Sequence, residues 1–340
     1  MLLFLVASRR KTLPVREGDH SNTTDSHSCL PPAPPLTCAM RKLFTALFCA
    51  SVAATAIAHH LPFAAEAEAP VLIARAHAKR LSPTDLEIRG DIAGLPPGST
   101  RFLAREDLLA LAQVTYRVTD DPNFTRPTEV SGVLLEDLDR SLAGTPDADL
   151  VIAICDDQYR AHYPRAYLAA HQPLLVLKVN GQPPERWPKD AEGHGQSMGP
   201  YMISHREFTP GFTVFAHQDE LQIPWGVVRL EFRSEKTVFG AIAPHGPAAA
   251  DSSVQAGYRI AQQNCFRCHD QGGEGGLKAR HPWLVLSAWA TASPEHFAAY
   301  VRHPRSETPY AQMPPNPGYD DATLQALIAY FRTFQSPEKP

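Results

Sequence analysis

The hexapeptide Asn-Cys-Phe-Arg-Cys-His at residues 264–269 constrains this chain more than any other stretch of its sequence. It separates Cys265 from Cys268 by two residues and places His269 directly after the second cysteine. Two cysteines at this spacing are typical of a redox dithiol, of half a structural zinc site, or of the covalent attachment point of a haem. Each of these sites requires different surroundings, so the flanking residues have to distinguish them.

The flanking sequence favours haem attachment. A redox dithiol of the thioredoxin type lies near a βαβ unit, whereas the residues on both sides of this pair have helical spacing. A structural zinc site needs four ligands, usually with a second cysteine or histidine pair at short spacing, and no such pair follows in the sequence. In the remaining interpretation Cys265 and Cys268 would form thioethers with the porphyrin, and His269 would bind the iron.

The residues next to the pair predict the surroundings of a flat cofactor. Asp251 or Ser252 can cap a helix that runs to Gln263 and delivers the two cysteines. Gly257 lies on the apolar face of this helix, where it permits close approach of another backbone. Residues 270–278, DQGGEGGLK, form a glycine-rich loop that is able to skirt the cofactor.

Two further helices are predicted after this loop. Ser293, followed by a proline and an acidic residue, starts a helix that ends before Pro304. Asp320 or Asp321 caps the last helix. The apolar residues of this last helix recur at helical spacing: Leu324, Leu327, Ile328 and Phe331. This spacing predicts that the helix packs on a small core.

A second axial iron ligand is predicted at Met313, in the loop YAQMPPNPGYDD before the last helix. Pro314 and Pro315 stiffen this loop, as the presentation of a weak thioether ligand at a fixed distance requires. Ligation by histidine and methionine raises the potential of a low-spin haem that transfers electrons. Three histidines are the alternatives, each of which could equally serve at the surface: His281, His296 and His303.

These residues together resemble a small monohaem cytochrome c domain. The resemblance covers residues 252–336 and rests on the C-x-x-C-H motif, the Met-Pro-Pro loop, and the sequence ALIAYFRTF at 326–334. It implies an all-α fold around one haem c, in which the first and last helices cross and Gly257 lies near Tyr330 or Phe331. It also implies export, because the family attaches its haem outside the cytoplasm.

Residues 71–243 predict a different domain, with mixed strands and short helices. Three apolar runs resemble strands: ADLVIAIC at 148–155, PLLVLKVNG at 173–181 and WGVVRLEF at 225–232. Two stretches have helical spacing: AREDLLALAQ at 104–113 and LLEDLDRSLAG at 134–144. In the third strand Arg229 and Glu231 alternate with apolar residues, as expected of a half-buried strand. The absence of a regular βαβ rhythm in this sequence indicates an α+β fold.

This middle region resembles the molybdopterin-binding fold of sulfite-oxidase-like proteins. The resemblance lies in the order of four pieces: GVLLEDL (132–138), DDQYRAHYP (156–164), LLVLKVNGQPP (174–184) and GPYMI (199–203). Active members of that family supply a cysteine thiolate to molybdenum from a segment before the first piece. Here that segment, residues 114–131, has no cysteine, and Cys155 at the end of an apolar strand is interpreted as inert core. We therefore expect the fold without molybdopterin.

The N-terminal residues carry the pattern of an export signal. Arg41 and Lys42 precede an apolar run that is shorter than the about 20 residues of a spanning helix. An A-x-A site ends at Ala58, and a second small-residue site ends at Ala69. The predicted segments outside the two domains are an upstream extension from a misassigned start codon (1–39), the signal peptide (40–58), a leader (59–70) and a linker (244–251).

Composition adds limits on partners. The chain is 44% hydrophobic and 20% charged with a net charge of −4, which argues against nucleic acid and against a basic membrane-binding patch. We interpret the protein as an exported, periplasmic c-type cytochrome that passes single electrons between redox partner proteins, more an electron carrier than an enzyme. Two alternatives stay open. One is a molybdenum-dependent oxidoreductase with a fused haem c acceptor, and the other is a haem-based sensor.

Overall fold

The structure is a computed structural model that describes residues 69–189 and 195–335. The predicted upstream extension, the signal peptide and most of the leader lie outside these residues. All described residues belong to one compact unit of the chain, residues 64–340. Among them, no helix is both long enough and apolar enough to cross a membrane.

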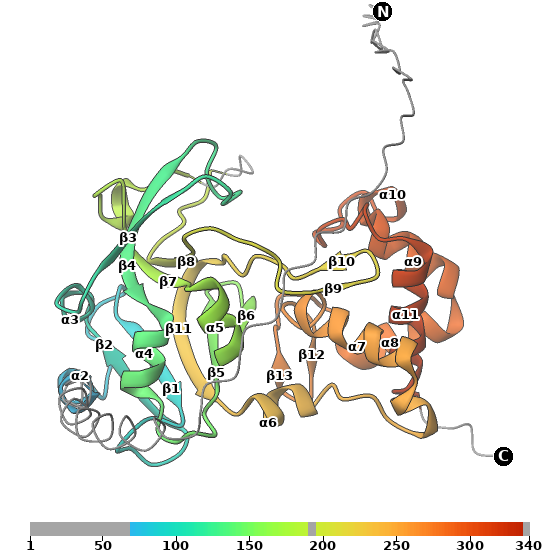
Figure 1. Cartoon of the computed structure of the whole chain (residues 1–340), viewed down its shortest axis with the longest axis horizontal. Coiled ribbons are helices and arrows are strands. Elements are labelled where there is room, and N and C mark those ends of the chain that lie inside the picture. The colour runs from blue at the N-terminus through green and yellow to red at the C-terminus, as the bar shows by residue number, and fades with distance from the viewer. Residues whose placement is uncertain (1–68, 190–194, 336–340) are drawn as a thin grey trace, which may run out of the picture. The chain divides into compact units, whose positions relative to one another are not determined.

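Within the described residues, nine strands form one mixed sheet in the first part of the chain, which we call the body (Figure 1). The strand order is β2-β1-β11-β8-β7-β4-β3, and β5 pairs with both β11 and β6. The β1–β11 pair is parallel and the other pairs are antiparallel. The strands are β1 (Leu86–Gly90), β2 (Ser99–Leu103), β3 (Val114–Val118), β4 (Thr128–Leu134), β5 (Leu150–Cys155), β6 (Arg160–Pro164), β7 (Leu174–Val179), β8 (Tyr201–Ser204) and β11 (Trp225–Arg233).

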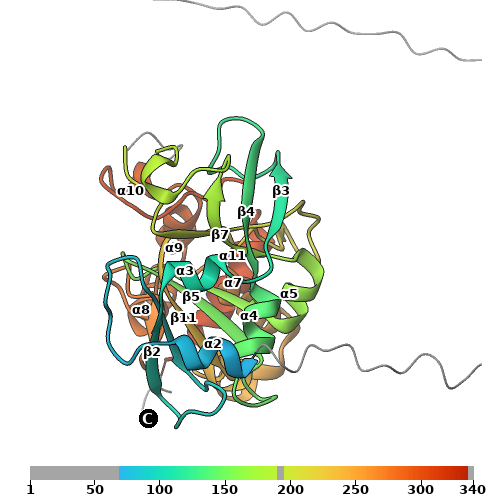
Figure 2. The same cartoon turned by 90° about the vertical axis from the view of Figure 1, so that its left-hand side faces the viewer.

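Short helices accompany the sheet, so the body is a sheet-rich mixture of strands and helices. Helix α4 packs against α2 and α5, as Figure 2 shows. The predicted helix over 104–113 is shorter in the structure, and the one over 134–144 is close to its predicted length. The helices are α2 (Ala69–Arg75), α3 (Arg105–Leu109), α4 (Leu135–Leu142), α5 (Arg165–His171) and α6 (Glu235–Gly240), with 3-10 turns at Pro184–Arg186 and Pro247–Ala250.

The predicted strands in the middle of the body are present. All residues of β5 are buried, as expected of an apolar run in the interior of a sheet. Strand β7 ends at Val179, and Asn180 and Gly181 after it, with φ angles of 49° and 70°, form the predicted turn. Asparagine and glycine tolerate this left-handed conformation better than other residues, which explains the position of the turn.

Strand β11 differs from its prediction as a half-solvated strand. Its Glu231 is only 5% exposed, because β11 lies in the interior of the sheet between β1, β5 and β8. A register shift between Val227 and Arg229 also interrupts the simple alternation of buried and solvated residues. The carboxylate of Glu231 pairs with Arg229 at 3.4 Å and with Arg233 at 3.5 Å, so its charge is compensated.

The rest of the chain, residues 252–335, is mainly helical. Asp251 caps the first helix through the amides of Ser253 and Val254, and Asp320 caps the last through Thr323, which confirms both predicted caps. Helix α8 was not predicted, and the expected glycine-rich loop contains a two-stranded hairpin. The elements are α7 (Ser252–Gln263), β12 (Asp270–Gln271), β13 (Glu274–Gly275), α8 (Trp283–Ala292), α9 (Pro294–Arg302), α10 (Pro304–Glu307) and α11 (Asp321–Arg332).

One hydrophobic core joins these helices to the sheet. Alternate residues of β5, Leu150, Ile152 and Ile154, belong to the same buried cluster as residues of α7, α8, α9 and α11. The other face of β5 belongs to the separate core of the body, through residues such as Val151 and Ala153. Because successive side chains of a strand point to opposite faces, β5 forms a wall shared by two cores.

Helices α7 and α11 cross at Gly257. A Cβ atom at this position would overlap the carbonyl oxygen of Ala326 and would lie 2.7 Å from Cβ of Tyr330. The predicted approach of Gly257 to the last helix is therefore confirmed, with Tyr330 as the neighbour. The side chain of Tyr330 continues to the body side, where its hydroxyl donates to the carbonyl of Ile242 at 2.6 Å.

Substitution Gly257→Ala is expected to destabilise the protein by about 1–3 kcal/mol, because the added methyl group meets backbone atoms that cannot rotate away. The thermal unfolding midpoint, followed by circular dichroism, should fall by several degrees. The matched control is Gly240→Ala near the end of α6, where a Cβ would meet nothing within 4 Å. Equal midpoints for the two variants would contradict the packing described at the crossing.

Candidate haem-binding site

The cysteine pair lies in a tight turn at the end of α7. The amide of Cys265 still donates to Ala261 at 3.0 Å, and the amides of Cys268 and His269 donate back to Cys265 at 3.2 and 3.1 Å. The motif therefore folds back on itself, with both cysteines in a single turn. Both are free thiols and half-buried.

The thiols are not poised as a redox dithiol. Burial raises the pKa of Cys265 to about 12, and burial also raises the pKa of Cys268. A reactive dithiol needs a cysteine whose pKa is lowered, so that a thiolate is available near neutral pH. Here burial raises the pKa of both cysteines, which argues against the dithiol interpretation.

His269 is oriented by a backbone carbonyl. Its Nδ1 lies 2.6 Å from the carbonyl oxygen of His281, and a carbonyl can only accept, so Nδ1 carries the hydrogen. Burial lowers the pKa of His269, which favours the neutral ring. In this tautomer Nε2 keeps a free lone pair, and a ring held through its other nitrogen is the usual arrangement of a histidine that binds a metal.

The glycine-rich hairpin packs directly on the motif. A Cβ at Gly276 would overlap the carbonyl of Arg267, and one at Gly275 would lie 2.5 Å from the ring of Phe266. Gly275 also has a φ of 86°, which other residues adopt with strain. Glycine is therefore required at both positions for the hairpin to approach the cysteine turn.

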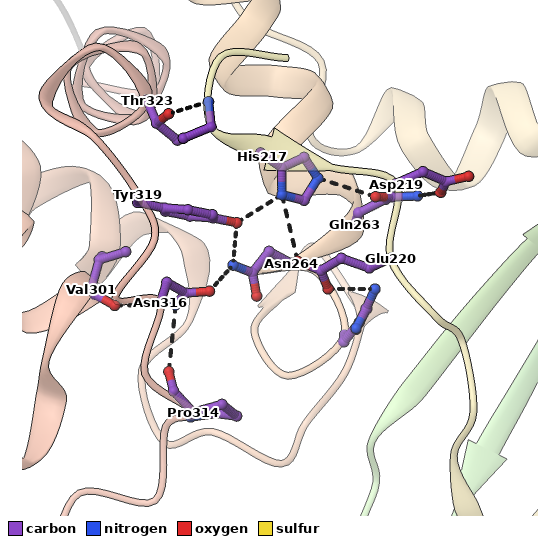
Figure 3. Close-up of polar contacts among 12 residues, drawn as sticks. His217, Asp219, Glu220, Gln263, Asn264, Val301, Pro314, Asn316, Tyr319 and Thr323 are labelled. Carbon is purple, nitrogen blue, oxygen red and sulfur yellow. Dashed lines mark hydrogen bonds and ion pairs between the residues drawn. The ribbon is translucent and has the colours of Figure 1, made fainter. Parts of the chain in front are cut away.

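Met313 lies in the irregular segment between α10 and α11 and is half-buried against the helical core. Asn316 fixes this segment, because its Nδ2 donates to the carbonyl of Val301 at 3.1 Å (Figure 3). Asn264 donates in turn to Oδ1 of Asn316 at 2.9 Å. Since Asn264 precedes Cys265, this hydrogen bond joins the segment that carries the cysteines to the segment that carries Met313.

The three alternative histidines have other partners or positions. The backbone carbonyl of His281 accepts from Nδ1 of His269 at 2.6 Å. His296 lies 3.0 Å from the carboxylate of Glu307. His303 is an exposed residue at the junction of α9 and α10. Met313 therefore stays the predicted second axial ligand, and the three histidines stay its alternatives.

Four large apolar side chains of the helical part are exposed. They are Leu277 (51%), Leu284 (55%), Val285 (41%) and Tyr310 (93%). In the described ranges, no three Cys, His, Asp or Glu side chains gather as a metal-binding group. Two cysteines in one turn, followed by a histidine whose Nδ1 is held by a carbonyl, are a donor set that fits a covalently attached haem.

Strand β6 of the body contacts the two residues between the cysteines, Phe266 and Arg267. The amide of Arg160, the first residue of β6, donates to the carbonyl of Arg267 at 2.9 Å. The ring of His162 stacks on Phe266 with the ring centroids 5.1 Å apart. Burial lowers the pKa of His162 to about 3, so this ring is neutral and acts as packing.

Cys155 is placed as the sequence predicts. It is 2% exposed at the end of β5, and burial raises its pKa well above the usual value. Residues 114–131, where sulfite-oxidase-like proteins supply the molybdenum ligand, form β3, the start of β4 and their connection. Neither region presents an accessible thiolate.

A cavity of about 490 Å³ lies at one end of β1 and β11. Its charged lining consists of Arg89, Asp91, Asp147, Arg160, Arg229, Glu231 and Arg233. Arg229 also pairs with Glu87 at 2.7 Å, and Arg233 pairs with Glu274 at 2.5 Å. The charges of Arg229 and Arg233 are thus compensated by carboxylates.

A segment that the sequence did not single out reaches the helical part from the sheet. Residues 205–224, between β8 and β11, carry the hairpin β9 (Thr213–Val214) and β10 (His217–Gln218). We call this segment the arm. Its Glu220 lies 2.9 Å from Arg267 inside the cysteine motif, and its Phe212 ring contacts Arg259 of α7 at 3.8 Å. Loop residues without periodicity gave no signal for this contact.

Comparison with known proteins identifies the helical part. Residues 252–331 match the family described as cytochrome c oxidase, cbb3-type, subunit III. No curated protein matches the chain.

Among solved structures, the chain is similar to the sulfane dehydrogenase SoxCD from Paracoccus pantotrophus at 17% identity, over 47% of this chain and 41% of that one, with a TM-score of 0.30. At this TM-score the similarity carries no argument, and the resemblance of the body to sulfite-oxidase-like proteins stays a prediction. The chain thus combines a mixed, sheet-rich body with a C-terminal cytochrome c domain similar to that of the cbb3-type subunit III family.

Proposed function

We propose that the protein is an exported c-type cytochrome that carries one haem and transfers single electrons in a periplasmic redox chain. The observation that carries this proposal is the geometry of His269. This histidine follows the cysteine pair, holds its Nδ1 hydrogen on a carbonyl and leaves Nε2 free. The match of residues 252–331 to a cytochrome family supports the same conclusion.

In this proposal each residue has a defined task. Cys265 and Cys268 would hold the porphyrin through thioethers, and His269 and Met313 would be the ligands of the iron. When bound, the haem supplies an iron that changes reversibly between its ferrous and ferric states. The carbonyl of His281 keeps the His269 ring oriented, and the hydrogen bonds of Asn316 keep the Met313 segment in place.

Purified exported protein tests the proposal. Elemental analysis should give one iron per chain, and the haem should remain attached through acid-acetone extraction. A potentiometric titration of the reduced-minus-oxidised spectrum should follow a one-electron curve. Absence of covalent haem, or two-electron behaviour without iron, would reject the assignment.

The body is proposed to be a scaffold without molybdenum. The first reason is the lack of a cysteine in residues 114–131, and the second is the burial of Cys155. Expression in a host that makes molybdopterin should give protein with iron but without stoichiometric molybdenum. Near-stoichiometric molybdenum would favour the alternative function, an oxidoreductase that passes electrons to its own haem. In that event Cys155→Ala would test the remaining candidate ligand.

A further inference from the structure

A buried histidine of the arm lies between the body and the cytochrome domain. His217 is 1% exposed. Its Nδ1 lies 2.8 Å from the hydroxyl of Tyr319, which precedes α11, and its Nε2 lies 3.1 Å from Oε1 of Gln263 at the end of α7 (Figure 3). The tip of the arm is fixed beside it, because the amide of Ala216 donates to Oγ1 of Thr323 at 3.0 Å.

The partners of His217 determine which nitrogen carries its hydrogen. Gln263 donates through Nε2 to Oδ1 of Asp219 at 2.5 Å, so its Oε1 is the acceptor that faces His217. The Nε2 of His217 therefore donates, and in a neutral ring Nδ1 accepts. Burial lowers the pKa of His217, in agreement with a neutral ring. Nδ1 also lies 3.5 Å from Oε1 of Glu220, but a carboxylate only accepts and cannot serve a nitrogen that carries no hydrogen. The Tyr319 hydroxyl, at 2.8 Å, must then be the donor to Nδ1.

Further hydrogen bonds connect Tyr319 to the segment that carries Met313. Asn264 donates through Nδ2 to the oxygen of Tyr319 at 2.8 Å and to Oδ1 of Asn316 at 2.9 Å. Asn316 donates through its own Nδ2 to the carbonyl of Pro314 at 3.4 Å. Pro314 follows Met313 directly. Asn264 and Asn316 each donate through Nδ2 to two acceptors. Loss of His217 or of the Tyr319 hydroxyl leaves the other of these two buried groups without the hydrogen bond that joins them.

We propose that His217 is a positioning residue for the Met313 segment: through Tyr319, Asn264 and Asn316, the body determines how readily the thioether leaves the iron. The proposal rests on the proposed function, because the ligand role of Met313 is part of that function. In this proposal the body controls the iron ligand of the cytochrome domain, and the body needs no metal of its own to do so.

Imidazole, a competing iron ligand, measures this positioning directly. Oxidised full-length protein is titrated with imidazole while the weak near-infrared charge-transfer band of sulfur on ferric haem is followed. The variants are Tyr319→Phe, which removes one oxygen and keeps the ring, and His217→Leu. In each variant, the imidazole concentration that displaces half of the Met313 ligand should be about fivefold lower than in wild type. A fivefold change in an equilibrium constant corresponds to the loss of about one hydrogen bond. The double variant should also show about fivefold and not the product, because both changes break the same series.

A destabilised control separates positioning from general loss of stability. Leu108 is fully buried in the core of the body, which is a different core from the one against which the arm residue Val214 packs. Leu108→Ala should lower the thermal midpoint, because it leaves a cavity, and should leave the imidazole titration unchanged. If His217→Leu does not fold, the comparison of Tyr319→Phe with Leu108→Ala is sufficient to test the proposal.

The outcomes distinguish the two proposals. Wild type with the sulfur band and variants that titrate like wild type, or that act additively, would overturn the role of His217 and leave the cytochrome assignment intact. Wild type with covalent haem but without the band would overturn the ligand role of Met313, and the role of His217 with it. Tighter imidazole binding in both single variants, without a further gain in the double variant, supports positioning by the body.

Discussion

Replacement of both Cys265 and Cys268 by alanine is expected to abolish all haem that stays with the chain after acid-acetone extraction. The C-x-x-C-H pattern occurs once in the sequence, so the proposal contains no second attachment point. Axial ligands alone do not survive acid and organic solvent, whereas thioether bonds do. The measurement is the haem absorbance of the extracted polypeptide, compared with that of wild type prepared in parallel.

Cys155→Ala is the matched control for this experiment. It removes a cysteine that is buried in β5 and should therefore keep the haem. Persistence of extraction-resistant haem in the double cysteine variant would show that the attachment point lies elsewhere. Loss of haem in Cys155→Ala together with normal folding would assign that cysteine a role that its burial does not suggest.

Substitution Met313→His is expected to lower the midpoint potential by about 100 mV or more, on the order of 2 kcal/mol for one electron. A thioether is a soft, neutral ligand that favours ferrous iron, whereas imidazole is a stronger donor that favours the ferric state. Axial-ligand identity is among the main determinants of haem potential, which spans about 0.8 V across proteins. A potentiometric titration against wild type measures the shift.

Met313→Ala should have a different effect, because no side chain then reaches the iron on that face. The oxidised spectrum should become partly high-spin, and both Met313 variants should lose the sulfur charge-transfer band. A low-spin spectrum with an unchanged potential in Met313→Ala would show that another residue is the ligand. His281 would be tested next, and the sensor interpretation would gain support.

Local sequence signals predicted the helical part well where they were strong. Asp251 and Asp320 cap helices because their carboxylates reach free amides in the first turn, a relation that depends only on near neighbours. Helix α8 was missed for a physical reason. Trp283, Leu284, Val285 and Leu286 are consecutive apolar residues, and such a run lacks the periodicity that separates a helix from a strand.

The sheet was harder to predict because its pairing is not local. The strand over 225–232 could be recognised, but its parallel pairing with β1 joins residues far apart in the sequence. Burial of Glu231 follows from that pairing and from the neighbouring β5, and no pattern within the strand itself indicates it. The expectation of a solvated face was therefore wrong for this residue.

In the candidate site, too, some residues could be named from the sequence and others could not. Cys265, Cys268, His269 and Met313 could be named because spacing and residue type carry their chemistry, and they remain predictions until haem is measured. Their supporting residues could not be named. Asn316 and Tyr319 look like ordinary polar residues of a loop, and His217 lies in a distant part of the chain. Only the folded arrangement brings these three into one hydrogen-bonded series.

The shared wall formed by β5 has a consequence for the cytochrome domain as a separable module. Because Leu150, Ile152 and Ile154 lie in the core that also holds Trp283 and Phe266, the domain has no complete interior of its own. Excision at residues 244–251 would uncover apolar surface and favour aggregation. A group that binds only the folded chain stabilises everything that unfolds with it, so haem loading would also protect the body against unfolding. The body would then serve the cytochrome domain by completing its apolar core, whether or not it binds a ligand of its own.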